Sequence, residues 1–434
     1  MKDIFKVIKY KYIPSKKERK LLRLLCHISK NLYNSTLYTL RMEYFKTKKV
    51  ISYYELNKIL KTNENYHILN TYTSICIIRT VHTAFTNFVK GYTKLPKYLK
   101  QNDYYQLYTE QIRYAYLNDK LSIKLPLSNL TRTSKTFNKM FEDELINNFI
   151  KESDIKKSFD IYFKIPKVIK DKYIRVFRII PSFKGLSYDI QITYVDDTTI
   201  KINKDPNKIM AIDLGVNNLA TCVLSNNESF IIDGKYLKSI NHFYNKQKAS
   251  LQEKKQNQKE YTLMEYKVTE KRNRRINDII NKAARQLINI AITKQVSEII
   301  IGYNKGFKTK GIKSDLPNKE KSRINQNFIQ LPISKFKNKI KELCSRYNIK
   351  YMEINESYTS ICSFYDNEEI KYHRNYLGKR MTRSLFKTKE GKIINADING
   401  ALNILKKGKP DRTDIISFLR NIGQTVPIRQ KIKL

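Results

Sequence analysis

The stretch from Ile209 to Gly215 reads IMAIDLG and places Asp213 directly after four apolar residues. A continuous apolar run that ends in turn-forming residues is typical of a strand buried on both faces of a sheet. A carboxylate at the end of such a strand is costly to bury unless it is paired or bound to a metal ion. The stretch therefore predicts a central strand of an α/β domain, ending in a functional acid.

The chain after this stretch alternates between apolar runs and helical stripes, as expected for an α/β domain. Asp205-Pro206-Asn207 reads as a turn that separates the domain from the preceding chain. The tail after Lys409 is basic and shows no clear element. We expect further strands at 231–234, 298–302 and 349–354, helices at 336–347 and 397–405, and a long polar helical hairpin at 236–295.

The first half of the chain combines both kinds of periodicity. Alternating apolar and basic residues predict an opening strand that is broken at Pro14, and helical spacing then predicts a bundle. We therefore expect a β-rich module with a helical insertion over 1–205. Its elements are strands at 4–13, 121–125 and 188–194, a helical bundle from 15 to about 95, a helix at 137–150 and a turn at 184–185.

The composition indicates a folded and very basic protein. The 434 residues allow about three domains, and 84 Lys and Arg against 40 Asp and Glu give a formal net charge of +44. A hydrophobic content of 41% excludes a disordered basic tail, and the absence of a long apolar run excludes a membrane protein. Basic residues recur along the whole chain, so nucleic acid is the expected partner, with aromatic rings available to stack on bases.

The five cysteines are widely separated, and no two of them form a CxxC pair. That spacing fits neither a zinc knuckle nor a disulfide framework. The N-terminal stretch has no apolar signal core. We therefore expect a reducing compartment, the cytoplasm or nucleoid if the source is bacterial, in which the thiols serve as small apolar residues.

Three acids in the second half lie at the ends of expected elements: Asp213 and Glu353 on strands, and Asp397 at the start of a helix. Converging carboxylates repel one another unless divalent cations lie between them, and hard oxygen ligands favour Mg²⁺ or Mn²⁺. Two such ions can promote phosphodiester hydrolysis. Each acid also has a structural alternative. Asp213 could be a turn residue, Glu353 could form an ion pair with Lys350 or Arg346, and Asp397 could be favoured by the dipole of its helix. Their order and strand context together favour a metal site.

Five ordered motifs resemble those of TnpB, a protein family encoded by many bacterial insertion sequences and related to the type V CRISPR effector nucleases. The resemblance is strong over about 205–407 and rests on layout alone over 1–204. The motifs are AIDLGVNNLA at 211–220, LKSIN with YNK at 237–246, NQNF at 325–328, EINESYTS at 353–360 and INADINGALNIL at 394–405.

The resemblance implies an RNA-guided DNA endonuclease. Such a protein binds a structured guide RNA derived from the mobile element, checks a short motif beside its target in double-stranded DNA, and cleaves at one RuvC site. Carried over by motif position, the catalytic and metal-binding acids are Asp213, Glu353 and Asp397, which would hold two Mg²⁺ or Mn²⁺ ions.

The resemblance also implies a multidomain fold of α+β and α/β parts. Its two main parts are an N-terminal β-barrel-like wedge with an inserted helical bundle and an RNase H-like RuvC domain with a helical lid. The implied divisions are the wedge at 1–14 and 101–205, a recognition lobe at 15–100, the RuvC domain at 206–360 and 395–409 with its lid at 236–295, a basic loop at 361–394 and a basic tail at 410–434.

One departure from the family concerns zinc. Many members carry a zinc ribbon with two CxxC pairs between the second and third acids, whereas this chain has only Cys362 there. His373 could join it, but two ligands are too few for a structural site, so we expect no zinc. Basic side chains are expected to contact nucleic acid. The candidates are Lys379, Arg380 and Arg383 in the loop and Lys271, Arg272, Arg274 and Arg275 in the lid.

Two other functions remain open. A DDE-like transposase also uses an RNase H fold and three acids but acts without RNA; a histidine-pair transposase is excluded because the five histidines contain no HxH motif. The second alternative is a non-catalytic regulator that binds RNA or DNA, against which the retention of all three acids argues. A nuclease assay with divalent metal separates these possibilities.

Overall fold

The chain folds into two compact units, Met1–Asp197 and Thr198–Leu434, a division close to the break expected before residue 206. The computed structural model describes residues 5–117, 120–128, 161–196, 200–215, 217–255, 261–304, 332–423 and 426–432. The helix expected at 137–150 and the NQNF motif at 325–328 lie outside the described residues. The protein is a multidomain α+β protein, and its described part contains no helix with the length and apolar character of a membrane span.

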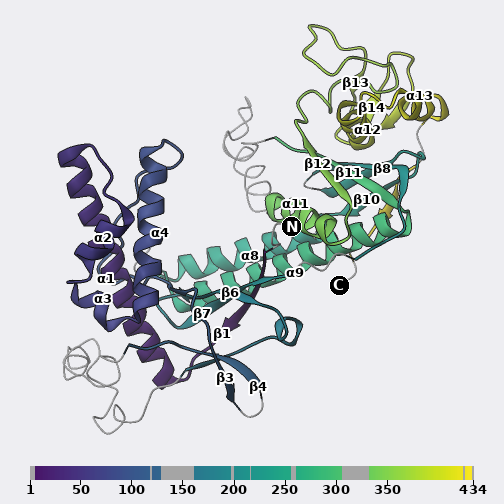
Figure 1. Ribbon diagram of the computed structural model, residues 1–434. Helices are drawn as coiled ribbons and strands as arrows, with labels where there is room; N and C mark the ends of the chain where they lie inside the picture. The colour runs from purple at the N-terminus through teal and green to yellow at the C-terminus, as the bar shows by residue number, and fades with distance from the viewer. Residues whose placement is uncertain are drawn as a thin grey trace. The chain divides into compact units, whose positions relative to one another are not determined.

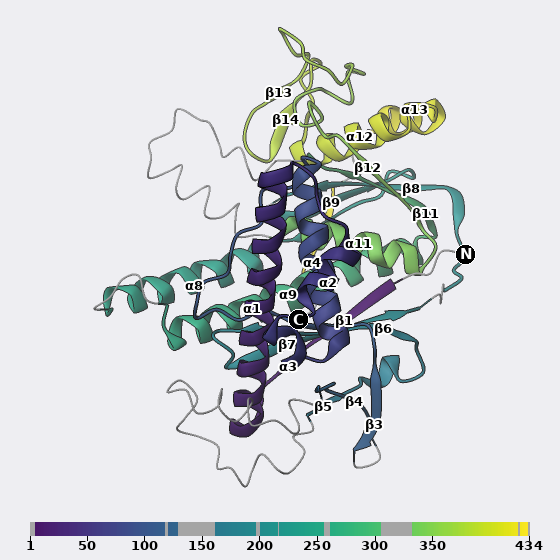
Figure 2. The same ribbon diagram turned by 60° about the vertical axis from the view of Figure 1, so that its left-hand side comes forward.

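The first unit opens with the predicted strand and helical bundle. The side chain of Ser15 caps the first helix in a reciprocal capping box with Glu18. The first and last helices of the bundle lie side by side and bury residues such as Leu32 and Phe85 between them and their neighbours (Figure 2). The elements are β1 (Phe5–Tyr12), α1 (Lys16–Thr47), α2 (Tyr53–Leu60), α3 (Glu64–Ile68) and α4 (Thr71–Val89).

Two antiparallel sheets, of order β1-β7-β6-β2 and β3-β4-β5, make up the β-rich part of this unit. The predicted turn joins β6 to β7, with positive φ angles of 51° at Lys184 and 70° at Gly185. Alternate side chains of β7, Tyr188, Ile190 and Ile192, are fully buried, which confirms the predicted strand. The strands are β2 (Leu107–Thr109), β3 (Arg113–Leu117), β4 (Lys120–Lys124), β5 (Tyr162–Lys164), β6 (Ile174–Ser182) and β7 (Ser187–Val195), with a 3-10 turn at Lys167–Ile169.

A six-stranded mixed sheet of order β12-β11-β8-β9-β10-β16 forms the centre of the second unit (Figure 1). β8, β9 and β10 are antiparallel neighbours, whereas β11 runs parallel to β8 and β12 parallel to β11. The carboxyl ends of β8, β11 and β12 therefore meet at one edge of the sheet. The strands are β8 (Asp205–Leu214), β9 (Asn218–Leu224), β10 (Ser229–Asp233), β11 (Val296–Gly302), β12 (Lys350–Ile354) and β16 (Ile428–Gln430).

Helices cover both faces of this sheet (Figure 1). On β8, Met210 and Ile212 pack with α9 and α11 on one face, and Ile209 and Ala211 pack with α12 on the other. Because side chains alternate along a strand, Asp213 lies on the α12 face. The helices are α8 (Lys235–Glu253), α9 (Leu263–Thr293), α11 (Ile333–Arg346) and α12 (Ala396–Gly408).

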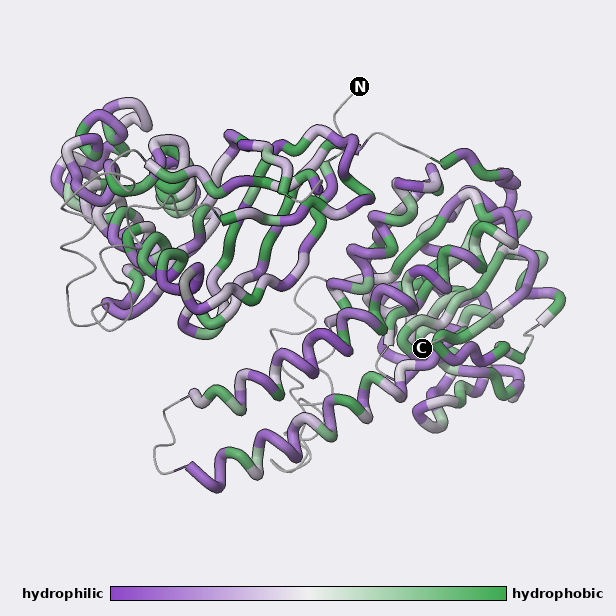
Figure 3. The backbone as a smooth tube through the Cα atoms, turned by 90° about the horizontal axis from the view of Figure 1, so that it is seen from below, coloured by the Kyte–Doolittle hydropathy of each residue, from purple (hydrophilic) through white to green (hydrophobic). Residues whose placement is uncertain are grey.

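α8 and α9 form the predicted helical hairpin, which reaches away from the sheet (Figure 3). The buried apolar residues of α9 run from Ile276 to Ala291 and contact the sheet. The remainder of both helices is mostly hydrophilic in Figure 3. The hairpin is therefore anchored at one end, and its other end offers polar and basic side chains to solvent.

Three expectations need correction. Asp205 begins β8 instead of forming a turn, because its backbone pairs with β11 at Val296, with a register shift before Glu298. The segment 361–394 contains a small antiparallel sheet of β13 (Lys379–Arg380), β14 (Leu385–Lys387) and β15 (Ile393–Asn395), not only a loop. The tail adds α13 (Thr413–Ile422), whose apolar face packs on α12, and β16, which extends the large sheet.

Candidate active site

Asp213 lies near the carboxyl end of β8, half-buried against α12. A Cβ atom added to Gly400 would lie only 2.9 Å from Oδ2 of Asp213, so a side chain at that helix position would collide with the carboxylate. The glycine of the INADINGALNIL motif therefore makes the room that the acid needs beside the helix.

Asp397 is held in the first turn of α12. The Asn395 side chain caps this helix by accepting hydrogen bonds from the backbone amides of Asp397 at 3.0 Å and Ile398 at 3.1 Å. Nδ2 of Asn218, the first residue of β9, donates to Oδ2 of Asp397 at 2.7 Å. Since β9 pairs with β8, Asn218 links the strand that carries Asp213 to the helix that carries Asp397.

Glu356 is the third acid of this group, placed just after β12. Its charge acts on Asp213, and its Cβ lies 3.1 Å from where a Cβ on Gly302 would be. Gly302 ends β11, the strand next to β8, and itself has no side chain to offer. The Ser357 amide donates to Oδ1 of Asn355 at 2.8 Å, which forms the turn that carries Glu356.

Glu353 lies on the other face of the sheet. It shares the α11 side of β12 with Tyr351, whereas Met352 and Ile354 pack on the α12 side. Its carboxylate forms an ion pair with Nζ of Lys337 at 2.6 Å and accepts a hydrogen bond from the Tyr351 hydroxyl at 2.9 Å. These contacts engage both carboxylate oxygens away from Asp213.

The predicted set of acids therefore needs one correction: the acid of the 353–360 motif whose charge acts on Asp213 is Glu356, and Glu353 is turned to the opposite face of the sheet. The structural alternative for Glu353, an ion pair, is the one that forms. Its partner is Lys337 of α11 rather than Lys350 or Arg346, because α11 covers that face of β12.

Burial and mutual repulsion set the ionisation of the group. Burial raises the pKa of Asp213 well above its usual value, the charges of Asp397 and Glu356 raise it further, and Arg380 lowers it. Burial also raises the pKa of Glu356. At Glu353, hydrogen bonds from Lys337 and Tyr351 outweigh the effect of burial and hold the pKa below its usual value. For Asp213 and Glu356, nearby groups do not offset the cost of burying the charged carboxylate, whereas Lys337 and Tyr351 do so for Glu353.

The chemistry of the group suits a divalent cation. Three carboxylates supply hard oxygen ligands, and a bound cation would relieve the repulsion that raises the pKa of Asp213. Within the described residues, no three acidic, histidine or cysteine side chains are yet close enough together to hold a metal ion. Instead, the guanidinium of Arg380 contacts Oδ1 of Asp397 at 3.3 Å. The residues present fit a cation in identity and charge.

The three basic candidates of segment 361–394 differ in position. Arg380 contacts Asp397, as described above, and Lys379 beside it is exposed. Arg383 is exposed and lies near Lys238 of α8, whose pKa is lowered by burial and by the Arg383 charge. Lys238 in turn donates to Oδ1 of Asn217 at 2.5 Å. Positive side chains therefore lie close to Asp397 and to the start of α8.

Among the lid candidates, Arg272 has a structural contact that the sequence does not reveal. Its Nε and one terminal nitrogen donate to Oδ1 of Asn241 at 2.8 and 2.6 Å, and its guanidinium lies over the Tyr244 ring. Arg272 therefore ties α9 to α8. Lys271, Arg274 and Arg275 are exposed, so they are the lid residues placed to meet a polyanion.

Hydrogen bonds organise the first part of the segment 361–394. The carboxylate of the buried Glu368 accepts from the backbone amides of Ser363 at 2.7 Å and Leu377 at 2.9 Å. Cys362 is buried with its Sγ 3.6 Å from the Lys371 carbonyl oxygen, and the His373 ring contacts the Glu369 carbonyl oxygen at 2.7 Å. Glu368 thus joins two distant parts of the segment. The absence of zinc stays a prediction.

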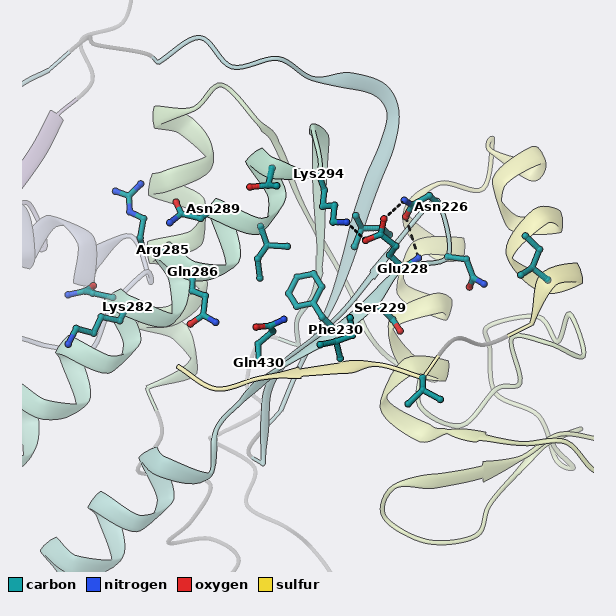
Figure 4. Close-up of a pocket in the computed structure, with 18 residues that line it drawn as sticks. Asn226, Glu228, Ser229, Phe230, Lys282, Arg285, Gln286, Asn289, Lys294 and Gln430 are labelled. Atoms are coloured by element: carbon teal, nitrogen blue, oxygen red, sulfur yellow. Dashed lines mark hydrogen bonds and ion pairs between the residues drawn. The ribbon is translucent and has the colours of Figure 1, made fainter. Parts of the chain in front are cut away.

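A pocket of about 940 Å³ lies at the opposite end of the sheet from Asp213 (Figure 4). It is lined by the turn between β9 and β10, by α9 and by the C-terminal strand. At its rim, Glu228 pairs with Lys294 at 2.6 Å and accepts from Asn226 at 2.8 Å. None of the three acids lines this pocket, so it is separate from the group around Asp213.

Comparisons with known proteins match both the region of Asp213 and the region of Asp397. Residues 191–308 match the family OrfB_IS605, described as a probable transposase, and residues 334–404 match the Cas12f1-like TNB domain. TnpB-like protein ORF457 of Acidianus two-tailed virus is 27% identical over 244 residues, which cover 51% of this chain and 48% of the viral protein. The chain thus spans about half the length of this curated relative.

The fold is similar to that of a solved nucleoprotein complex. The protein chain in the cryo-EM structure of the Cas12f1-sgRNA-target DNA complex aligns over 90% of this chain and 83% of its own length. The TM-score is 0.59 and the sequence identity is 17%. At 17% identity this structural match shows a similar fold only, whereas the two family matches rest on the sequence.

Proposed function

Since the chain is related to the TnpB family, we propose that it is an RNA-guided DNA endonuclease whose active site is built from Asp213, Glu356 and Asp397. The observation that carries this proposal is that three carboxylates from separate elements lie toward the carboxyl ends of the central strands, where the charges of Asp397 and Glu356 act on Asp213. Ligands of open α/β sheets bind at that edge. Two of the three acids have a raised pKa, which is common at functional sites.

The three carboxylates would hold two divalent cations, Mg²⁺ or Mn²⁺. Such ions, when bound, supply an activated water and stabilise the leaving oxygen of a phosphodiester. The chain's own residues position the ligands. Asn218 fixes one oxygen of Asp397, the Asn395 cap fixes the helix start that carries it, and Gly400 leaves room for Asp213.

The topology of the second unit supports an RNase H-like, RuvC-type assignment. Three antiparallel strands, β10, β9 and β8, are followed by two parallel strands, β11 and β12, as expected for that fold. We assign the α8–α9 hairpin as the lid and the segment 361–394 as a DNA-contacting insertion. By the same resemblance, α1–α4 would form the recognition lobe, and the two sheets of the first unit would form the wedge beside the target motif.

The expected partners are a structured guide RNA derived from the mobile element and double-stranded target DNA. A net charge of +44 needs a polyanion of comparable size, and exposed basic residues such as Lys271, Arg274 and Arg275 are placed to supply phosphate contacts. The similar solved chain is part of a complex with sgRNA and target DNA. Both observations support the same pair of partners.

Sequencing the RNA that copurifies with the chain tests this function. The chain would be expressed together with the DNA that flanks its gene, purified at moderate salt, and its bound RNA sequenced. We expect one defined, structured RNA species encoded beside the gene. Random fragments of cellular RNA, or no RNA at all, would contradict the RNA-guided function.

The name of the matched family favours one other candidate, a DDE-like transposase acting without RNA. That enzyme would use the same three acids to join DNA ends. Incubation of the RNA-free chain with DNA that carries the element's ends, followed by sequencing of junctions, separates the two. Strand-transfer products would support the transposase, and linear cleavage products that depend on RNA support the endonuclease.

A further inference from the structure

A positive side chain lies within the group of acids. The guanidinium of Arg380 donates to Oδ1 of Asp397 at 3.3 Å, and Asn218 holds the other oxygen, Oδ2, at 2.7 Å. The charge of Arg380 also reaches Asp213. One cationic group therefore interacts with two of the three proposed metal ligands.

The fold determines this placement. Arg380 on β13 pairs with Phe386 on β14, and Phe386 pairs with Ile394 on β15, which leads directly into α12 and Asp397. Phe386 is fully buried, and a Cβ on Gly378 would collide with its ring, so only a residue without a side chain lets the chain pass at that point. The small sheet thus ties Arg380 to the start of the helix that carries Asp397.

We propose that Arg380 competes with divalent cations for Asp397: it neutralises the acid while the site is empty and releases it when a cation binds. The guanidinium is then free to contact a phosphate of the DNA backbone, for which its planar set of donors is suited. This inference rests on the proposed function, because it takes Asp397 as a metal ligand. It assigns one residue to two successive tasks, protection of the empty site and positioning of the substrate.

Metal affinity measured without DNA tests the first task. Mn²⁺ would be titrated into the full chain and its free concentration followed by electron paramagnetic resonance, for the wild type, Arg380→Gln and Lys379→Gln. Lys379 is the matched control, since it is exposed on the same strand. We expect the half-saturating Mn²⁺ concentration to fall roughly three- to tenfold in Arg380→Gln, the size expected for loss of a partly exposed ion pair and a nearby positive charge. The Lys379→Gln value should stay within about twofold of the wild type.

The outcomes separate this inference from the proposed function. If Asp213→Asn and Asp397→Asn leave Mn²⁺ binding unchanged, the acids are not the metal ligands and the proposed function fails. If those variants lose binding but Arg380→Gln binds Mn²⁺ no more tightly than the wild type, only the competition fails.

The second task predicts slower DNA cleavage by Arg380→Gln even at saturating metal, with part of the rate restored in Arg380→Lys. Cleavage by Arg380→Gln at the wild-type rate would overturn that task.

Discussion

The two faces of β12 decide which acid of the 353–360 motif lies on the same side of the sheet as Asp213. Asp213 and Asp397 lie at the element ends predicted for them, and of the two glutamates Glu353 and Glu356 it is Glu356 whose charge acts on Asp213, whereas Glu353 is paired with Lys337. Both acids belong to one motif, and the difference depends on which sheet face each one reaches. Met352 and Ile354 pack toward α12, so Glu353 between them must face the other way. The sequence alone does not show this, because it does not say that α11 and α12 cover opposite faces of the sheet.

The raised pKa of Asp213 predicts that this acid destabilises the metal-free fold at neutral pH. A carboxyl with a raised folded pKa binds its proton more tightly when folded, so stability falls as the pH rises through that pKa. Asp213→Asn should therefore melt higher than the wild type at pH 8 in EDTA, by about 2–4 °C for each kcal/mol gained. The difference should shrink at pH 5, as measured by thermal melting.

Glu353→Gln is the matched control, for which we expect a change in melting temperature of the opposite sign. Its lowered pKa stabilises the fold above the unfolded-state pKa of about 4.3, and this contribution is lost only as the pH falls through the lower folded value. The Glu353→Gln chain should melt below the wild type at both pH 8 and pH 5. A lower melting temperature for Asp213→Asn at pH 8 would contradict the burial and repulsion described for Asp213.

Secondary-structure elements were largely predictable, because hydrophobic periodicity reports which face of an element is buried. The central strand, the α8–α9 hairpin and the N-terminal bundle all follow such patterns. The C-terminal α13 and β16 were missed: the stripe of Ile415, Ile416 and Leu419 is short, and β16 consists of three residues that depend on pairing with β10. The sheet of β13, β14 and β15 was missed because its strands are equally short and pair only with one another among the described residues.

Glu368 is predicted to hold the β13–β15 segment together without zinc. Glu368→Ala would leave the amides of Ser363 and Leu377 without their acceptor, at a cost of roughly 1–3 kcal/mol in unfolding free energy. Hydrogen exchange at these two amides should accelerate. Glu369→Ala is the control, because the Glu369–Lys371 pair is solvent-exposed and should leave the unfolding free energy almost unchanged. One zinc ion per chain by elemental analysis, with folding of the segment lost on chelation, would overturn this account.

Across the whole chain, net charge and composition predicted a nucleic-acid partner, and the family matches agree with that prediction. The arrangement of functional groups was less accessible. Arg272 reads as one more basic residue of the lid, yet it joins the two helices of the hairpin. Charge can be counted from a sequence, whereas the partner of each charge depends on which elements pack together.

A charge of this size predicts RNA binding that depends steeply on salt. If the guide contacts six or more phosphates, counterion release should lower the affinity by roughly 10³-fold or more between 50 and 200 mM salt. Filter binding of the copurified RNA across this range measures the slope. An affinity that changes less than about threefold would mean that phosphate contacts are not the main source of binding.

The central claim is that Asp213, Glu356 and Asp397 together cleave DNA selected by a guide RNA. Its most direct test is Mg²⁺-dependent cleavage of a DNA that matches the bound RNA, compared between the wild type, Glu356→Gln and Glu353→Gln, with RNA binding measured in parallel. We predict that Glu356→Gln lowers the cleavage rate at least 100-fold while binding RNA normally, and that Glu353→Gln retains a rate within about tenfold of the wild type, since metal ligands contribute several kcal/mol to such reactions. Near-normal cleavage by Glu356→Gln, with cleavage abolished in Glu353→Gln, would contradict the site described here.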